Sequence, residues 1–549
     1  MKTKQQFFYN ALLLTAVTLL MRTVSVAFNV YVSNRVGAEA MGLLALVSSV
    51  YGFATTLATS GIHLATVRTV AARLEQSGGA ENKRVLRACL AYAASFGTLS
   101  MLLLLAFSRP IGVMLLKDVR TVRALQMLAF TLPPIALTTV MNGYFTAVRR
   151  AWKNALAQVS EQAVKITFTG YLLVVVAPKT VEGSVLAILL GGAVAESLSL
   201  LFNTVLYLFD KRRFHHVKEI KNGKSVRVAS VAMPVAISAY MRSGLLAIEH
   251  ILIPRGLSAY GAGNGAALAA YGTLHSMALP VVLYPAAILS SFSALLIPEV
   301  TEQESAGNKR EIRYIAGRAY QLTLLFSVGV SAIMLLLSRE LGTVLYDSEE
   351  VGRYIALLAP LLPVMYLDTA TDAMLKGLGQ QVYSMNVNIA DALISVIAVA
   401  LLVPRMGIGG YLVTIYITEL FNAAFSILRL LKVSGFRPRF ASLFLRPLLA
   451  AVGAAAMARL IFSLLSLTAG SAGLALHIGI IGLFYSLLLL MLGGFGRADV
   501  KWLLGCLFVF RDKNMGSSPA NDRNEAEKCN EPVCDPSPLT PCKSSRLRV

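Results

Sequence analysis

The chain has 549 residues, of which 56% are hydrophobic and 14% are charged, and its mean hydropathy is +0.65. A water-soluble fold would have to bury more apolar surface than one chain covers, so this composition excludes a soluble enzyme. The formal net charge of +21 therefore indicates basic loops beside a membrane surface rather than nucleic-acid binding.

Apolar stretches long enough to cross a bilayer recur along the chain. A hydrocarbon core of about 30 Å needs about 20 apolar residues per helix. Fourteen such stretches are predicted, at 8–32, 40–60, 85–107, 121–147, 155–177, 183–209, 226–253, 268–297, 314–337, 352–376, 383–403, 408–431, 441–466 and 473–495. The sequence thus predicts an all-α integral membrane protein with about 14 transmembrane helices.

Lysine and arginine concentrate in alternate loops of this series, including the N-terminus with Lys2 and Lys4 and the segment from Lys211 to Arg227. Cytoplasmic loops retain positive charge during insertion, so these loops are predicted to face the cytoplasm. With an even number of helices, both termini lie on the cytoplasmic side.

The chain contains an internal repeat. A shift of 230 residues aligns 108–161 with 338–391 without a gap, and a shift of 220 pairs Arg22 with Arg242 near the start of each half. The ten extra residues fit the glycine-rich loop at 261–265. Each repeat contains six helices, so both repeats enter the membrane in the same sense and enclose a cavity around an axis along the membrane normal.

The predicted organisation follows from this repeat. It comprises an N-lobe with helices 1–6 at 1–210, a basic cytoplasmic linker at 211–225, a C-lobe with helices 7–12 at 226–432, helices 13 and 14 at 433–496, and a cytoplasmic tail at 497–549. The tail is polar and rich in proline and serine, a composition typical of disorder.

Two arginines occupy equivalent places in the first helix of each lobe, Arg22 and Arg242. A charge at membrane depth costs about 2.5 to 3.5 kcal/mol on insertion scales, so each needs a partner or a watery cavity. Across the repeat axis, the two guanidinium groups would form a cationic clamp suited to a diphosphate. The alternative is that each arginine snorkels to the interface or bonds a carbonyl or carboxylate of its own lobe.

Carboxylates inside the predicted helices are candidates for binding a coupling cation or lining the cavity. They are Glu196, Glu249, Asp368, Asp372 and Glu419. Alternatively, Glu249 neutralises Arg242 two helical turns away, and Asp372 forms a self-contained pair with Lys376. The sequence has neither an ATP-binding glycine loop nor a zinc motif, so we expect no metal site and no cofactor beyond a coupling ion, Na⁺ or H⁺.

The stretch Leu14–Ala72 resembles the opening of the stage V sporulation protein B and polysaccharide-exporter group. The resemblance is carried by Arg22, by GAEAMGL at Gly37–Leu43 and by SGIHLATVRTVA at Ser60–Ala71. Residues Gly143–Ile166 are similar to the group's loop and helix 5 region. The group belongs to the multidrug/oligosaccharidyl-lipid/polysaccharide (MOP) flippase superfamily, and helices 13 and 14 resemble those of its longer lipid-flippase branch.

The resemblance implies a transporter, not an enzyme, that moves undecaprenyl-diphosphate-linked oligosaccharide by alternating access without ATP. This substrate is a peptidoglycan or polysaccharide precursor for cell wall or spore cortex synthesis. The resemblance also implies that arginines of helix 1 and of helix 7 or 8 line the cavity, and that helices 13 and 14 form a groove for the lipid tail. It places the chain in the bacterial plasma membrane. We expect a monomer whose partners are the lipid-linked substrate and the bilayer, with no nucleic acid.

The alternative function is a multidrug antiporter of the multidrug and toxin extrusion type. Such a protein exports cationic drugs and couples to Na⁺ or H⁺ through buried carboxylates. Two arginines in the cavity argue against a cationic substrate, because like charges repel most strongly away from water. A scaffold without transport is a third alternative, which the duplicated bundle disfavours.

Overall fold

The computed structural model describes residues 2–76, 83–148, 150–176, 180–211, 228–436, 441–465 and 470–494. The chain divides into two units, residues 1–499 and 500–549, and the second lies outside the described residues. The predicted tail and residues 212–225 of the predicted linker also lie outside them. The described residues form helices, with no strand among them, which confirms the all-α class.

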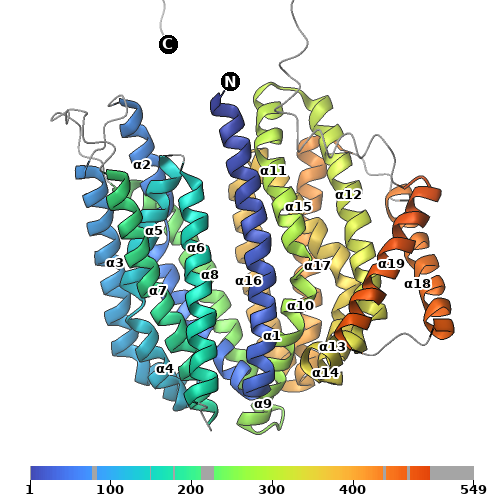
Figure 1. The fold of residues 1–549 in the computed structure, drawn as a ribbon, viewed down its shortest axis with the longest axis horizontal. Helices are drawn as coiled ribbons and strands as arrows, with labels where there is room; N and C mark the ends of the chain where they lie inside the picture. Colours follow the sequence, from blue (N-terminus) through green and yellow to red (C-terminus); the bar gives the residue numbers. More distant parts are fainter. Residues whose placement is uncertain are drawn as a thin grey trace, which may run out of the picture. The chain divides into compact units, whose positions relative to one another are not determined.

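The helices follow one another along the chain as shown in Figure 1. They are α1 (Lys2–Thr59), α2 (Ile62–Gln76), α3 (Lys83–Pro110), α4 (Arg120–Ala129), α5 (Leu132–Ala147), α6 (Ala151–Tyr171), α7 (Val181–Lys211), α8 (Val228–Ala259), α9 (Asn264–Tyr271), α10 (Leu279–Leu283), α11 (Ala286–Ser305), α12 (Lys309–Leu336), α13 (Ser338–Tyr346), α14 (Glu349–Leu358), α15 (Leu362–Gly377), α16 (Gln381–Met406), α17 (Ile408–Ser434), α18 (Arg446–Leu465) and α19 (Ser471–Met491). Shorter segments are π-helical at η1 (Ile111–Leu115), η2 (Leu172–Val176), η3 (Gly272–Ala278) and η5 (Ala441–Leu445), and 3₁₀-helical at η4 (Ala359–Leu361).

Helix α1 contains two predicted spans joined at Gly37. Gly37 has φ 82° and ψ 169°, a non-helical conformation at which the chain bends. A straight helix of 58 residues would be about 87 Å long, far more than the thickness of a bilayer. The glycine therefore lets the chain turn back without a loop, because it has no Cβ to oppose a positive φ.

Among the described residues, eleven helical stretches are long and apolar enough to cross a membrane, or twelve when the bent pair α4 and α5 counts as one span. One of the eleven, Val17–Ala71, contains the bend at Gly37 and so holds two predicted spans. The predicted span at 155–177 forms α6, which carries Glu161 and Lys165 and is not among the eleven. The chain is thus a multi-pass membrane protein, while the count of fourteen stays a prediction.

Proline residues interrupt equivalent spans in the two repeats. Helices α4 and α5 meet at a bend of 41°, and Pro133 lies in the first turn of α5. Helices α14 and α15 are separated by the short 3₁₀ segment η4, with Pro360 inside it and Pro363 just after it. Proline removes a backbone donor and disfavours a continuing helix before it, so it sets both breaks.

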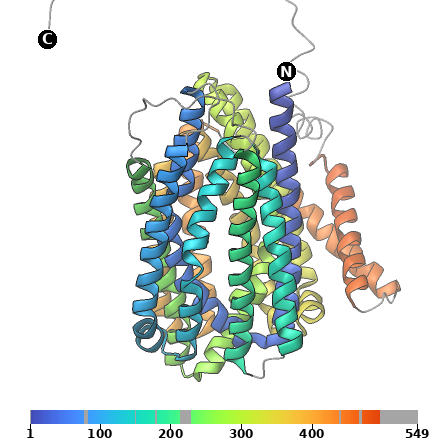
Figure 2. The same cartoon turned by 60° about the vertical axis from the view of Figure 1, so that its left-hand side comes forward.

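Buried apolar side chains of the described residues form two main clusters. One comes mainly from α1 to α5 and α7, and the other mainly from α8 to α17. A smaller cluster attaches α18 and α19 to α12, where the Tyr485 hydroxyl donates a 2.7 Å hydrogen bond to the carbonyl of Leu325. Figure 1 shows α18 and α19 beside α12 and α13, and Figure 2 shows this pair projecting from one side of the bundle.

Candidate functional site

Hydroxyl side chains link the two repeats along α1 and α8. Thr23 on α1 hydrogen-bonds Tyr284 across 2.9 Å, and Ser243 on α8 hydrogen-bonds Thr56 on α1 across 3.0 Å. Under the 220-residue shift, Thr23 and Ser243 are equivalent positions. The first predicted span of each repeat, 8–32 or 226–253, therefore uses the same residue position to contact the second predicted span of the other repeat, 268–297 or 40–60.

Arg22 and Arg242 each directly precede one of these contact residues. Both side chains are exposed, and neither donates a hydrogen bond to a described residue. Arg242 lies within electrostatic range of Asp391 on α16. The structure thus places Arg22 and Arg242 at equivalent positions, each next in sequence to a contact between the repeats, and no described residue connects them.

The repeats also touch backbone to backbone, where α1 crosses η3. A Cβ atom added to Gly42 would lie 1.9 Å from the carbonyl oxygen of Leu268, and one added to Gly272 would lie 2.2 Å from that of Ala38. The 230-residue shift relates Gly42 to Gly272 and Ala38 to Leu268, so the contact is nearly symmetric. Only glycine permits such an approach, and the two glycines close the seam near α9, at the end opposite the N-terminus (Figure 1).

Buried carboxylates gather in the second repeat. Glu249 on α8 is 8% exposed, hydrogen-bonds Ser395 on α16 and lies within electrostatic range of Asp391. Glu419 on α17 interacts electrostatically with Asp368 on α15 and with Asp391. Four helices therefore bring four carboxylates into one region, with Arg242 within electrostatic range of Asp391. A cation entering this region would offset their mutual repulsion.

The two aspartates of α15 have different partners. Asp372 forms a 2.6 Å ion pair with Lys376 and accepts a hydrogen bond from Ser384, so it is largely satisfied. Asp368 accepts one 3.3 Å hydrogen bond from Asn422 and interacts with the Ser426 hydroxyl, and its Oδ1 atom is buried without a close hydrogen-bond partner. Asp368 is thus the aspartate of this pair that is available to a ligand.

Aromatic and histidine side chains line the deeper end of this region. The Tyr271 hydroxyl and Nδ1 of His250 are 3.1 Å apart, and Nδ1 of His275 lies 3.3 Å from the Tyr411 hydroxyl. Glu249 interacts electrostatically with both tyrosines. These residues connect Glu249 to the buried core of the second repeat.

Charged residues of the first repeat lie between α6 and α7. Glu161 accepts a 2.9 Å hydrogen bond from Ser199 and interacts with Lys165 four residues later. Glu196 on α7 lies within electrostatic range of both. A pocket of about 300 Å³ adjoins Glu161, and four of its eight lining residues are apolar side chains of α7. Here the lysine supplies a positive charge beside the two carboxylates.

The structure divides the candidates predicted from sequence into three groups. Glu249, Asp368 and Glu419 come together, Glu196 lies in the other repeat, and Asp372 has a local partner. Ser395 and Asn422 were missed, although Ser395 lies one helical turn after Asp391 on the same helix. No group of three histidine, cysteine or acidic side chains suited to a metal ion occurs in the part of the chain that the structure describes.

Two family models match the sequence. A model described as polysaccharide biosynthesis protein matches residues 7–302, which is more than half of the chain, and a model described as MatE matches residues 259–401. Stage V sporulation protein B of Bacillus subtilis (strain 168) is 26% identical over 412 residues, covering 74% of this chain and 79% of that protein. Sporulation protein YkvU of the same strain is 24% identical over 251 residues, covering 45% of this chain and 56% of that protein.

Solved structures share the fold. The lipid II flippase MurJ in an inward closed conformation superimposes with a TM-score of 0.65 at 11% identity, covering 87% of this chain and 98% of that one. An inward-facing multidrug resistance MATE family transporter of the MOP superfamily gives a TM-score of 0.52 at 17% identity, covering 77% and 100%. These matches confirm the resemblance to the MOP superfamily.

Proposed function

The chain belongs to the polysaccharide biosynthesis protein family, and we propose that it is a flippase for undecaprenyl-diphosphate-linked oligosaccharide. The relatedness to stage V sporulation protein B and the shared fold with a lipid II flippase support this substrate class. We place the protein in the bacterial plasma membrane with both termini in the cytoplasm, acting as a monomer by alternating access and without catalysing a reaction.

The placement of the two arginines carries this proposal. Arg22 and Arg242 stand at equivalent positions, each next to a hydroxyl contact between the repeats. Neither guanidinium donates to a described residue, so the donors of both stay available to a ligand. Guanidinium binds phosphate oxygens in a bidentate manner, so a diphosphate held by one arginine of each repeat would move with their relative rotation.

We further propose that transport is coupled to Na⁺ or H⁺ through Glu249, Asp368 and Glu419, together with Asp391. These four carboxyl groups outnumber the two cations near them, Arg242 beside Asp391 and Lys376 beside Asp368. A cation bound among these carboxyl groups would stabilise one of the two alternating-access conformations more than the other. Such a difference in stabilisation is the requirement for coupling.

A multidrug antiporter is the second candidate, and the same carboxylates favour it. The MatE model covers residues 259–401, which include Asp368 and Asp391. Exposed arginines at the seam disfavour a cationic drug, because no described acid pairs with Arg22. The lipid-linked substrate therefore fits the seam better.

The test is translocation of a fluorescent undecaprenyl-diphosphate oligosaccharide in proteoliposomes. We expect the unmodified protein to flip the lipid, and Arg22→Ala and Arg242→Ala each to lower the rate by about tenfold or more, since charged hydrogen bonds contribute about 1.5 to 3 kcal/mol. Arg22→Lys should recover only part of the rate, because an ammonium group does not bind in a bidentate manner.

Arg405→Ala is the matched control, because Arg405 is also exposed on a helix of the bundle but lies away from these contacts. Exchange of a cationic dye against Na⁺ or H⁺, with no movement of the lipid, would establish the antiporter instead.

A further inference from the structure

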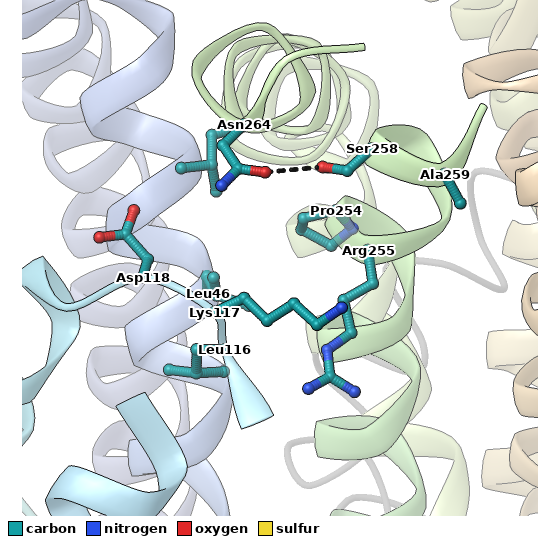
Figure 3. A pocket seen from close by; sticks show the side chains of 10 residues that line it. Leu46, Leu116, Lys117, Asp118, Pro254, Arg255, Ser258, Ala259 and Asn264 are labelled. Atoms are coloured by element: carbon teal, nitrogen blue, oxygen red, sulfur yellow. Dashed lines mark hydrogen bonds between the residues drawn. The ribbon is translucent and has the colours of Figure 1, made fainter. Parts of the chain in front are cut away.

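A second charged region lies between the repeats, at the end of the bundle opposite the N-terminus. It is a pocket of about 280 Å³ formed by the loop after η1 in the first repeat and by the end of α8 and the start of α9 in the second (Figure 3). Leu46, Leu116, Pro254 and Leu268 give it an apolar floor. Leu268 is also the residue whose carbonyl abuts Gly42, so the pocket adjoins the glycine contact.

Two cations, one from each repeat, extend into this pocket. Figure 3 shows the Lys117 side chain reaching toward α8 and lying alongside Arg255. The Arg255 Nη2 atom donates to the carbonyl of Met114 at 2.5 Å, while its Nε is buried without a hydrogen-bond partner. Lys117 makes no hydrogen bond or ion pair with a described residue. Two like charges side by side repel, so an anion between them would be stabilised.

The acidic residue in the pocket lining does not neutralise these cations. Both carboxylate oxygens of Asp118 accept hydrogen bonds from Arg120, with a shortest distance of 2.7 Å. Arg120 in turn contacts Glu39 at 2.8 Å. Figure 3 shows the Asp118 carboxylate pointing away from Lys117 and Arg255. The acids and Arg120 thus form their own cluster, which leaves Lys117 and Arg255 uncompensated.

The internal repeat provides a comparison for this site. The 230-residue shift relates Lys117 to Asp347, and the 220-residue shift relates Arg255 to Arg35. Lys117 and Asp347 are the two non-glycine residues with positive φ in the described part of the chain, at 54° and 49°, so the two loops share one backbone conformation. The repeat-related position thus combines an acid with an arginine, whereas this pocket combines a lysine with an arginine.

We propose that this pocket binds the phosphate group of a lipid headgroup. Uncompensated lysine and arginine donors suit phosphate oxygens, and the apolar floor suits a ligand attached to a lipid rather than a small ion alone. Two lipids share this chemistry, the diphosphate of the transported lipid and the phosphate of a bilayer phospholipid. The first source rests on the proposed function, while the second does not. Either phosphate would bridge the repeats beside the glycine contact and stabilise the conformation seen here.

The experiment measures lipid binding to the full chain by native mass spectrometry. The probes are undecaprenyl diphosphate and phosphatidylglycerol, with inorganic pyrophosphate as a competitor. We expect Lys117→Asn and Arg255→Gln each to weaken binding by about tenfold or more, and Lys117→Asp to abolish it. Asparagine and aspartate tolerate a left-handed backbone, so both Lys117 variants should fold.

Arg353→Gln is the matched control, because it removes an exposed cation that does not line the pocket. Unchanged binding of both lipids in the Lys117 and Arg255 variants would overturn the proposal. The same holds if Arg22→Ala is the one substitution that reduces lipid binding. If the Lys117 and Arg255 variants lose phosphatidylglycerol binding while the unmodified protein flips no oligosaccharide lipid, the pocket is supported and the proposed function is refuted.

Discussion

The two repeats carry different residues at one pair of equivalent positions. The 230-residue shift relates Glu161 and Lys165 on α6 to Asp391 and Ser395 on α16. In the first repeat the carboxylate keeps a lysine one turn away. In the second, a serine replaces that lysine and hydrogen-bonds Glu249 instead. The second repeat has therefore lost a counter-ion and gained an acid, which makes it the repeat suited to binding a cation.

The strongest test of this comparison removes the acids one repeat at a time. We expect Asp391→Asn and Glu249→Gln to lower cation-driven translocation by about tenfold or more, because a bound cation loses a direct charge partner. Glu161→Gln and Glu196→Gln should change it by less than about threefold, because Lys165 already interacts with both. The measurement is flipping in proteoliposomes with and without a Na⁺ or pH gradient. Equal losses in the two repeats would contradict the comparison.

Restoring the counter-ion should convert the second repeat into a copy of the first. Ser395→Lys would place an ammonium group beside Asp391 and Glu249, and we expect several-fold weaker gradient dependence. Ser395→Met is the control, since it adds similar bulk without charge, and Ser395 is only 5% exposed. A methionine variant with the same loss as the lysine variant would show that volume, not charge, governs this position.

At the glycine contact, by contrast, the repeats are alike, and matched substitutions should have matched effects. Gly42→Ala and Gly272→Ala each place a Cβ within 2.2 Å of a carbonyl oxygen, so each should destabilise the fold by about 1 to 3 kcal/mol. Gly52→Ala on the same helix meets no atom within 4 Å and should be neutral or slightly stabilising. Thermal unfolding in detergent measures all three. A lower unfolding temperature for Gly42→Ala but not for Gly272→Ala would refute the symmetric contact.

The helices and the repeat could be predicted from the sequence because both depend on local composition and on spacing along the chain. The prediction gave 121–147 as one span, which the structure divides into α4 and α5 at a bend beside Pro133. It ended one span before Gly37 and began the next after it, and the structure has a non-helical bend at this glycine. It selected α6 as a span although this helix carries Glu161 and Lys165, and the number of spans depends on such borderline helices.

Side-chain partners depend on how helices rotate and pack, which sequence spacing does not specify. The pair Asp372 and Lys376 was predictable because i, i+4 neighbours meet on any helix. The link between Glu249 and Ser395 was not, because these residues are 146 positions apart and meet only when α8 packs on α16. The same holds for Lys117 and Arg255, which come together from different repeats.

The smallest expected effect concerns the ion pair of α15. Asp372 and Lys376 correspond to Asn142 and Thr146 in the first repeat, where the Thr146 hydroxyl donates to the carbonyl of Asn142 at 2.8 Å. The neutral pair shows that the fold does not require a charge here. The side chains of Asp372 and Lys376 are 25% and 45% exposed, so solvent screens their attraction. We expect a coupling energy below about 1 kcal/mol from a double-mutant cycle of Asp372→Asn and Lys376→Thr.

The double variant should also flip lipid at close to the unmodified rate, since it reproduces the residues of the first repeat. A large loss of transport in Asp372→Asn, without loss of stability, would place Asp372 among the coupling carboxylates after all. Asp368→Asn is the matched comparison on the same helix, and it should lose more transport because one of its carboxylate oxygens has no hydrogen-bond partner. The difference between these two aspartates separates a structural charge from a coupling charge one helical turn apart.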